Sequence, residues 1–437
     1  MDRHICGYPL VFLFHFSHKP INIFRIMLCI DGYLSLKIHY YTEIKEDNFY
    51  ILIGNRGRLV TIQNPNVIIF QPALPAYRLD FFDRVSQRLG DEFVVCYSPT
   101  DMGALSARSL EPTWARRLAP MRHLLPGLDW QPGVLSTPFR RGDFIVVSGA
   151  PRNVSNMLML AWARLKGART IWWGHYWSST SKAHRFFLRL LLMKFADALL
   201  FYTDQEVAEY RRGHGKRDRR IVTALNNGIN VDPIQALREP YDPDGRKNAI
   251  LFLGRLTKKA ELPVLLNALS DPRLRNVRLN IVGDGPERPM LEEFAGKLGI
   301  SGQIVWHGGT TEEPEIASIA NKCRLFVYPG GVGLSLLHAM AYGLPVVVHE
   351  DRWRHMPEIA AFYRAENGVT FASGNFKSLA SAIVAGLEFT AADNSWSEAS
   401  IKVADTEFNT REMANRFCTL VSHLLTNHND AQYSEAD

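Results

Sequence analysis

Cysteine is scarce in this chain of 437 residues, which contains only five. They are widely scattered, at Cys6, Cys29, Cys96, Cys323 and Cys418. The number is odd and no two lie at the short spacing of a zinc site. We therefore expect neither structural zinc nor a disulfide framework, and we infer a reducing compartment.

Long apolar runs are also missing from the sequence. The nearest early candidates, residues 10–16 and 21–30, fall short of the roughly 20 apolar residues that a membrane-spanning helix needs. No small-residue cleavage site follows either run, so we do not expect a cleaved signal peptide. The sequence thus predicts a cytoplasmic protein without a transmembrane helix.

Alanine is absent from the beginning of the chain, where the first one is Ala73. Residues 1–65 are instead rich in Ile, Phe, Tyr and His. Two interpretations stay open for this extension: a start-site artefact, and a β-rich appendage. We expect the folded domains to begin at about Asn66.

The remaining length is sufficient for two globular domains, each with its own core. The formal charge of +6 suggests an anionic partner, such as a nucleotide, a membrane surface or nucleic acid. Charge alone does not choose among these three.

Short apolar strands alternate with amphipathic helices along most of the chain. In the first half we expect strands near residues 67–70, 93–97, 144–147, 170–173, 199–202 and 221–229. In the second half we expect them near residues 249–253, 279–282, 304–307, 325–328 and 346–348. This alternation predicts an α/β protein with two doubly wound, Rossmann-like domains. We place the first at 66–240 and the second at 241–405.

One histidine stands where ligands bind in such sheets. The strand at 170–173 ends at Gly174, and His175 follows among aromatic residues. Ligand sites lie at the carboxyl ends of parallel strands, so we expect His175 to point into a cleft. The alternative is a structural histidine that only makes a hydrogen bond.

The most informative stretch runs from residue 328 to residue 348. An apolar strand leads into Gly330, Gly331 and Gly333, and a short helix follows, for which Ser335 is the expected N-cap. Glycines between a strand and a helix let backbone amides surround an anion, and the helix dipole adds positive potential. A phosphate or diphosphate fits this arrangement. The alternative is a tight turn with no ligand.

This stretch resembles the sugar-donor segment of GT-B glycosyltransferases of the group 1, or family 4, type. The glycines, Leu334 and residues 339–341 and 343–345 match that segment. Further matching motifs lie at 254–256, 283–286, 306–308, 357–358 and 366–368. Two glutamates of the motif are replaced. Gly330 stands where the first would contact the donor sugar, and His338 stands where the second would hold the ribose.

The resemblance implies a nucleotide-sugar site on the second domain and an acceptor on the first. Arg255 would contact the diphosphate, and a lysine is expected five residues later, where this chain has Ala260. Lys259 is a substitute only if its loop is rearranged. With His175 these residues form the predicted catalytic set: Arg255, Lys259 and His175. The predicted substrate-binding set is Gly283, Gly285, Gly330, Gly331, Val332, Gly333, Leu334, Ser335, His338 and Glu358.

The resemblance also implies a GT-B arrangement, in which the two domains face each other across a cleft. A C-terminal helix, expected at 406–426, would cross back to the first domain, and we expect a disordered tail at 427–437. No cofactor or metal is expected, since the nucleotide-sugar is a co-substrate and the Asp-x-Asp at 242–244 lies in a turn-forming linker.

We therefore expect a retaining, metal-independent transferase that moves a sugar to a glycan or lipid-linked acceptor. The missing glutamates favour one alternative, a non-catalytic GT-B protein that binds a nucleotide-sugar or partners an active transferase. A nucleic-acid binder rests on net charge alone, and we expect no nucleic-acid partner. A dehydrogenase fits poorly, because Arg288 replaces the third glycine of a dinucleotide motif.

A basic and apolar segment at 183–195 indicates a further partner. Such helices can lie on an anionic membrane surface, which would place the protein peripherally on the inner face of a membrane. The alternative for this segment is a buried crossover helix.

Overall fold

The computed structural model describes residues 27–29, 37–39, 49–53, 59–63, 65–99, 112–176, 183–243, 245–246 and 248–434. It divides into two compact units, Met1–Asn66 and Val67–Asp437. In the first unit, β1 (Met27–Cys29) pairs with β2 (Lys37–His39), and β3 (Phe49–Ile53) pairs with β4 (Leu59–Gln63). Both pairs are antiparallel. The described part of the extension is therefore made of strands.

The second unit begins with a seven-stranded sheet in the order β13-β12-β11-β10-β5-β6-β7, in which every neighbouring pair is parallel. Its strands are β5 (Val67–Gln71), β6 (Phe93–Tyr97), β7 (Ala115–Arg117), β10 (Phe144–Ser148), β11 (Arg169–Trp173), β12 (Ala198–Phe201) and β13 (Ile221–Ala224). The expected strands are confirmed. The sequence did not predict the edge strand β7 or the antiparallel pair β8 (Arg122–Leu125) and β9 (Leu128–Trp130).

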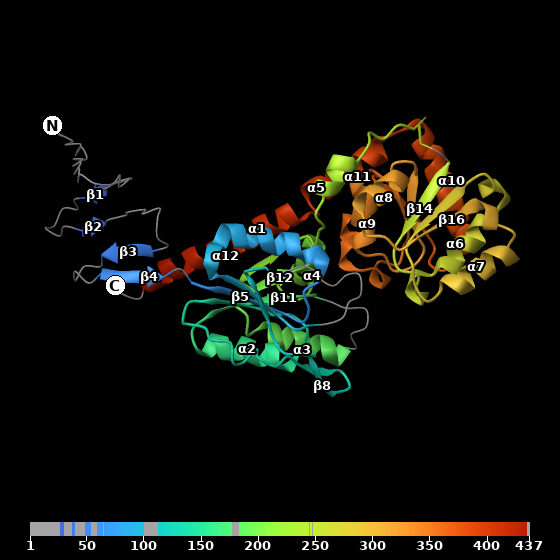
Figure 1. The fold of residues 1–437 in the computed structure, drawn as a ribbon. Coiled ribbons are helices and arrows are strands. Elements are labelled where there is room, and N and C mark those ends of the chain that lie inside the picture. The colour runs from blue at the N-terminus through green and yellow to red at the C-terminus, as the bar shows by residue number, and fades with distance from the viewer. Residues whose placement is uncertain are drawn as a thin grey trace, which may run out of the picture. The chain divides into compact units, whose positions relative to one another are not determined.

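Helices cover both faces of this sheet (Figure 1). One face carries α1 (Leu79–Leu89) and part of α12 (Thr410–Ser434). The other carries α2 (Val154–Leu165), α3 (Ala183–Met193) and α4 (Asp204–Gly213). Side-chain caps hold the starts of two of them, because Asn153 accepts from the Asn156 amide and Thr203 accepts from the Glu206 amide.

The C-terminal sheet has six parallel strands in the order β16-β15-β14-β17-β18-β19. They are β14 (Ala249–Leu253), β15 (Arg278–Val282), β16 (Ile304–Gly308), β17 (Leu325–Tyr328), β18 (Val346–His349) and β19 (Gly368–Phe371). The strand order reverses between β14 and β17. Ligands of open α/β sheets bind at such a switch point, outside the carboxyl ends of the strands.

Two apolar cores enclose this second sheet. One contains residues of α6 (Leu262–Leu269), α7 (Arg288–Lys297) and α10 (Phe376–Ala392). The other contains residues of α8 (Glu313–Ala320), α9 (Leu334–Ala341) and α11 (Ser395–Thr406). The short α5 (Asp232–Leu237) lies between the two sheets in the chain.

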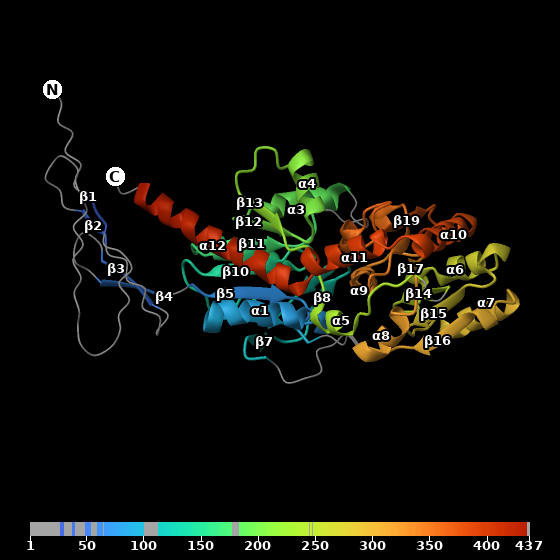
Figure 2. The ribbon, with the colours of Figure 1, turned by 90° about the horizontal axis from the view of Figure 1, so that it is seen from above.

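Helix α12 crosses back to the first sheet, as expected (Figures 1 and 2). Met413, Phe417, Leu420 and Val421 are buried in the same core as α1, and the Phe417 ring meets the Phe81 ring edge-on at 6.1 Å. The helix begins at Thr410 and continues to Ser434. The disordered tail expected from 427 is therefore wrong up to Ser434. No proline or glycine follows Asn427 to end the helix. Residues 435–437 lie outside the described part.

No helix in the described ranges is long and apolar enough to cross a bilayer.

Candidate active site

A cavity of about 500 Å³ lies between the two sheets of the second unit. From the N-terminal half, His175, Thr203, Glu206 and Glu209 line it. From the C-terminal half come Lys259, Glu261, Gly331, Arg352, Trp353, Arg354, His355, Met356, Pro357 and Ile359. Three of the residues predicted from sequence, His175, Lys259 and Gly331, thus share one cavity.

His175 follows β11 and points into this cavity, as expected. Its Nδ1 lies 3.3 Å from Oε1 of Glu206, and its ring lies 4.4 Å from the ring of Tyr202. Glu206 also accepts hydrogen bonds from the amides of Tyr176 and Tyr202. The carboxylate therefore orients the imidazole, while 35% of the histidine side chain stays exposed to the cavity.

The glycine loop after β17 is closely packed. A Cβ on Gly330 would lie 2.1 Å from the carbonyl oxygen of Lys259, and one on Gly331 would lie 2.4 Å from that of Arg354. Real Cβ atoms essentially never approach that closely. Glycine is therefore required at both positions by backbone contacts, and this backbone leaves no room for a carboxylate at Gly330.

The amides of this loop are not equally available. The Val332 amide donates to Nδ1 of His355 at 3.2 Å, and the Val332 side chain is buried. The amides of Gly331, Gly333, Leu334 and Ser335 have no acceptor among the residues that the structure describes. These four are the amides that an anion could use, since the first N–H groups of a helix lack partners within it.

The expected cap of α9 is wrong. Gly333 occupies the N-cap position and Ser335 lies inside the first turn, since the helix begins at Leu334. A Cβ at Gly333 would lie 3.2 Å from Cγ of Met356, so a larger cap residue would crowd the neighbouring segment. The helix consequently starts without a side-chain cap.

The switch point lies between β14 and β17. The glycine loop follows β17, and Arg255 follows β14 and Gly254. Its side chain is exposed and has no hydrogen-bond partner within the described ranges. Gly283 and Gly285 lie behind it, because added Cβ atoms there would come within 1.9 Å of the Gly254 oxygen and 2.4 Å of the Leu256 oxygen. The two glycines allow the β15 loop to pack against the backbone around Arg255.

Lys259 and Ala260 belong to a short 3-10 helix, Lys258–Ala260. Lys259 is exposed and lines the cavity, whereas Ala260 is fully buried in the core. The cation that the motif would supply at residue 260 is thus available one residue earlier. The Lys259 carbonyl contacts Gly330, so this loop and the glycine loop are held together.

His338 does not line the 500 Å³ cavity. Its Nε2 lies 2.9 Å from Oε1 of Glu313 at the start of α8, and its ring stacks on Tyr342 at 5.9 Å. The Tyr342 hydroxyl donates to the same Glu313 oxygen at 2.5 Å. Burial raises the pKa of Glu313, but the hydrogen bonds from His338 and Tyr342 outweigh it and hold that pKa below its usual range.

Comparison with known proteins agrees with this geometry. Residues 247–388, which carry both sides of the switch point, match the family model described as glycosyl transferases group 1. This part of the chain is similar to the glycosyl transferases group 1 family. The folds of solved GT-B glycosyltransferases match as well: one from Rickettsia africae has a TM-score of 0.62 at 14% identity, covering 83% of this chain and all of that one.

HepE of Anabaena, solved in complex with UDP, has a TM-score of 0.59 at 15% identity, covering 82% of this chain and all of that one. Among curated relatives, the alpha-D-kanosaminyltransferase of Streptomyces kanamyceticus is 28% identical over 36% of this chain and 43% of its own length. A GDP-mannose-dependent alpha-mannosyltransferase of Corynebacterium glutamicum is 33% identical over 26% of this chain. The match spans 25% of that relative, so less than half of either relative is covered.

Glu358, in the matched part of the chain, is buried rather than exposed to the cavity. One carboxylate oxygen accepts from the Asn227 amide group, and the other, Oε2, has no partner. Burial raises the pKa of Glu358, and the hydrogen bond from Asn227 and the charge of Arg78 oppose that rise. Arg78 is itself buried, with its guanidinium 4.8 Å from the Trp173 ring. Glu358 therefore helps to join the two halves of the unit.

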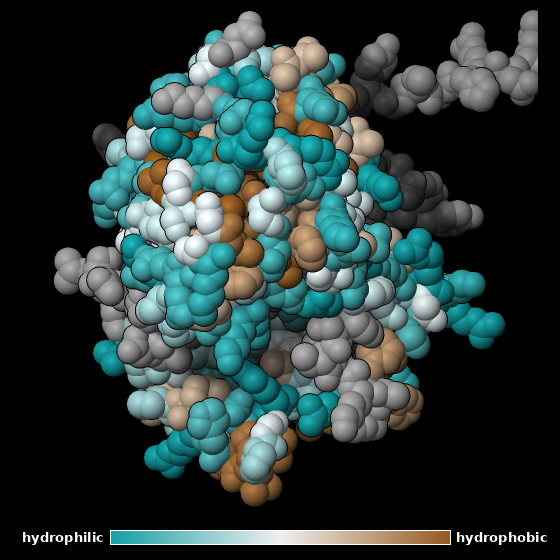
Figure 3. All heavy atoms as spheres, turned by 90° about the vertical axis from the view of Figure 1, so that its right-hand side faces the viewer, coloured by the Kyte–Doolittle hydropathy of each residue, from teal (hydrophilic) through white to brown (hydrophobic). Residues whose placement is uncertain are grey.

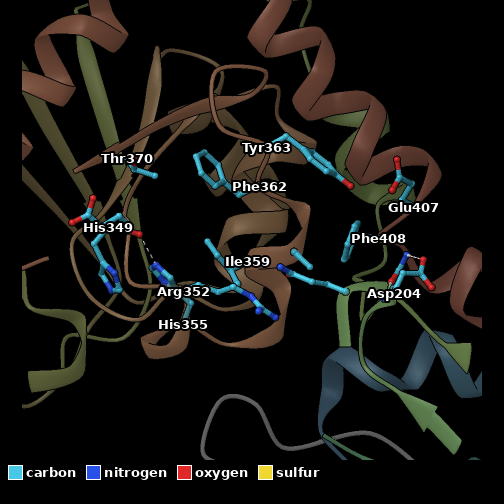
Figure 4. Close-up of a pocket in the computed structure, with 14 residues that line it drawn as sticks. Asp204, His349, Arg352, His355, Ile359, Phe362, Tyr363, Thr370, Glu407 and Phe408 are labelled. Carbon is cyan, nitrogen blue, oxygen red and sulfur yellow. Dashed lines mark hydrogen bonds between the residues drawn. The ribbon is translucent and has the colours of Figure 1, made fainter. Parts of the chain in front are cut away.

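A second cavity, of about 400 Å³, shares Arg352, His355 and Ile359 with the first. Figure 4 shows it between His349, at the end of β18, and the residues Asp204 and Glu407. The rings of His349 and His355 stack at 3.8 Å, and burial lowers the pKa of His349 to about 4. His355 donates from Nε2 to the His349 carbonyl and accepts at Nδ1 from Val332, which fixes its neutral form.

Sequence analysis missed several residues of this region. Glu313 is 25 residues before His338 and looks like an ordinary acidic residue in the first turn of a helix. Arg352 pairs with Glu209, and Arg354 pairs with Glu261. These pairs form between elements that are distant in sequence, so no local pattern could have indicated them. Within the described ranges, no group of three or more His, Cys, Asp or Glu residues could hold a metal.

Proposed function

We propose that this protein transfers a sugar from a nucleotide-diphosphate sugar to a glycan or lipid-linked acceptor, with retention of configuration and without a metal ion. The observation that carries the proposal is the arrangement at the switch point of the C-terminal sheet. There the guanidinium of Arg255, which has no partner among the residues that the structure describes, and the amides of the glycine loop belong to adjoining loops. The names of the curated relatives, all glycosyltransferases, support the reaction class.

The chemistry follows from charge. As the glycosidic bond breaks, negative charge develops on the departing diphosphate. Arg255 is always ionised and can contact phosphate oxygens with two parallel hydrogen bonds. Lys259 and the amides of Gly331, Gly333 and Leu334 would add further donors. The departing phosphate would then accept the proton of the acceptor hydroxyl, so that no second catalytic carboxylate is needed.

His175 would act on the opposite side of the cavity. Its ring is oriented by Glu206, and part of it is exposed where the two halves meet. We propose that it holds a hydroxyl group of the transferred sugar or the acceptor. A histidine can donate or accept such a bond, depending on its tautomer.

His338 and Glu313 would hold the ribose. The motif's second glutamate is missing, but the Glu313 carboxylate lies within hydrogen-bonding distance of the histidine that replaces it. We propose that Glu313 orients the imidazole and that the pair contacts the ribose hydroxyls. Glu313→Gln should then reduce the preference for UDP over 2′-deoxy-UDP, measured by thermal shift. Glu315→Gln, on the exposed side of the same helix, is the matched control and should keep that preference.

The decisive experiment is a transfer and hydrolysis assay with UDP-, GDP-, dTDP- and ADP-linked sugars, run beside thermal-shift binding of the free nucleotides. Turnover of at least one donor supports the proposal. Stabilisation by a nucleotide without turnover of any donor would instead support a binding protein, which the lack of room for a carboxylate at Gly330 favours. No binding and no turnover would contradict both functions.

A further inference from the structure

Large hydrophobic side chains are exposed together on one face of the N-terminal half. Of the 17 large hydrophobic residues exposed in the described ranges, three lie on the β8–β9 hairpin, three on α2, and four on α3 or just after it. Leu125, Leu165 and Phe187 are 63%, 83% and 68% exposed. Of the other seven, Trp353 and Met356 line the 500 Å³ cavity. In the view of Figure 3, hydrophobic residues are scattered among hydrophilic ones.

The three elements lie on the same side of the first sheet. The inner sides of α2 and α3 contribute Leu160 and Met193 to the same core against the sheet, so their outer sides face the same way. The hairpin adjoins the start of α2, because the Asp129 amide donates to the Arg152 carbonyl at 2.8 Å. Figure 1 shows α2, α3 and β8 together on one side of the sheet. We call these outer sides the apolar face.

The apolar face is also basic. Arg122, Lys166, Arg185 and Lys194 are exposed on or beside it, and the ammonium of Lys166 lies 4.7 Å from the Trp162 ring. Neither α2 nor α3 contains an acidic residue. The carboxylates nearby are neutralised, since Asp129 is buried against Arg152 and Asp197 pairs with Arg164. The face therefore offers hydrophobic and positively charged groups without opposing negative charge.

Helix α3 combines the two interpretations that the sequence left open. It is a crossover helix between β11 and β12, and Arg189 is buried with its guanidinium near the Tyr176 carbonyl. Its outer side nevertheless exposes Phe187, Leu188 and Leu191. A crossover helix in water would normally carry polar residues on that side, so the exposed residues require an apolar partner.

We propose that the apolar face docks on the surface of an anionic lipid bilayer. The exposed leucines and aromatic rings would enter the boundary between headgroups and acyl chains, while the basic residues would contact lipid phosphates. A second copy of this chain fits less well, because a two-fold interface would bring the same basic residues against each other. The proposal is independent of the proposed sugar transfer.

Vesicle flotation tests this proposal with the full chain. The vesicles contain phosphatidylcholine alone, or an equal mixture of phosphatidylcholine and phosphatidylglycerol. We expect binding to the mixture, weakened by added salt. The double variant Trp162→Glu with Phe187→Glu should reduce the bound fraction on the order of tenfold. The matched control, Met290→Glu with Phe376→Glu, changes two residues of 43% and 41% exposure in the C-terminal half and should bind as the unchanged chain does.

A second pair of variants tests how much the basic residues of the apolar face contribute to binding. Arg185→Gln with Lys194→Gln should weaken binding to the anionic vesicles by about fivefold for each charge removed. Lys322→Gln with Lys377→Gln removes two exposed charges elsewhere and should have little effect. Melting curves of all four variants would verify that each is folded.

Three outcomes would overturn the proposal. The first is equal binding to both vesicle types. The second is equal loss of binding in the Trp162 and Phe187 variant and in its control. The third is a change from dimer to monomer in that variant, seen in gel filtration, with vesicle binding unchanged; it would assign the apolar face to a second copy of the chain.

Discussion

The guanidinium of Arg255 is exposed and has no partner in the described part of the chain. If it contacts the departing diphosphate, Arg255→Ala removes a charge-assisted hydrogen bond to developing charge. We expect kcat/KM to fall by an amount equivalent to about 2–4 kcal/mol. Steady-state kinetics with the active donor would measure this.

Arg275→Ala provides the control for that substitution, because Arg275 is also exposed in the C-terminal half but precedes β15, whereas Arg255 follows β14. Its kinetics should match those of the unchanged chain. If Arg255→Ala leaves both nucleotide affinity and turnover intact, the proposed donor site is wrong.

Ala260 stands at a position where the fold does not admit the lysine of the family motif. The family motif would have a lysine there, but the alanine is fully buried in the core. Ala260→Lys would place an ammonium among apolar side chains, so we expect the free energy of unfolding to fall by at least about 2 kcal/mol. Denaturant titration would measure it. Lys258→Ala, at an exposed position two residues earlier, should change stability little.

His349 makes stability depend on pH. Burial, and then the neighbouring His355, lower its pKa from the usual 6.5 to about 4. Between pH 6.5 and about 4 the unfolded chain binds a proton that the folded chain does not. The contribution of His349 to the free energy of unfolding is therefore complete above pH 6.5 and is lost as the pH falls toward about 4. Denaturant titrations at several pH values in this window would measure how the free energy of unfolding depends on pH. We expect a weaker dependence for His349→Gln than for the unchanged chain. His423→Gln, at an exposed position on α12, should keep the original dependence.

Among the elements, the glycine loop offers the sharpest test of packing. Gly330→Glu would restore the residue of the motif, yet its Cβ would lie 2.1 Å from the Lys259 carbonyl oxygen. We expect the variant to be less stable and less active, since the loop and residues 258–260 would have to separate. A melting temperature equal to that of the unchanged chain, together with higher activity, would show that this loop can move to admit a carboxylate.

Most elements of the second unit could be predicted from sequence, because each βα unit has a buried apolar strand and a one-sided helix of its own. The edge strand β7 could not, since its three residues include two exposed arginines and show no alternation. The position of His175 in a cavity could be predicted, because ligand sites lie at the carboxyl ends of parallel strands. The His338–Glu313 bond did not, because it depends on how α8 and α9 pack. The same holds for the meaning of Gly330, which depends on a carbonyl 71 residues away in the chain.

For the molecule as a whole, the division at Asn66 leads to a truncation experiment. Met1–Asn66 forms a compact unit of its own, and the first sheet begins with β5 at Val67. Because the seven-stranded sheet begins at Val67, where the second unit starts, we expect a chain starting at Gln63 to melt at the same temperature as the full chain. A decrease of several degrees in calorimetry would show that the extension stabilises the rest.

Helix α12 gives the chain an order of assembly. The ribosome makes the first sheet early, but the apolar side of α1 is covered by Phe417 and its neighbours, which are made after the whole second sheet. During synthesis the second domain can close its core while the first still exposes hydrophobic surface that chaperones recognise. The domain that starts first therefore finishes last, and a ribosome that stalls before Thr410 releases a chain whose first domain is incomplete.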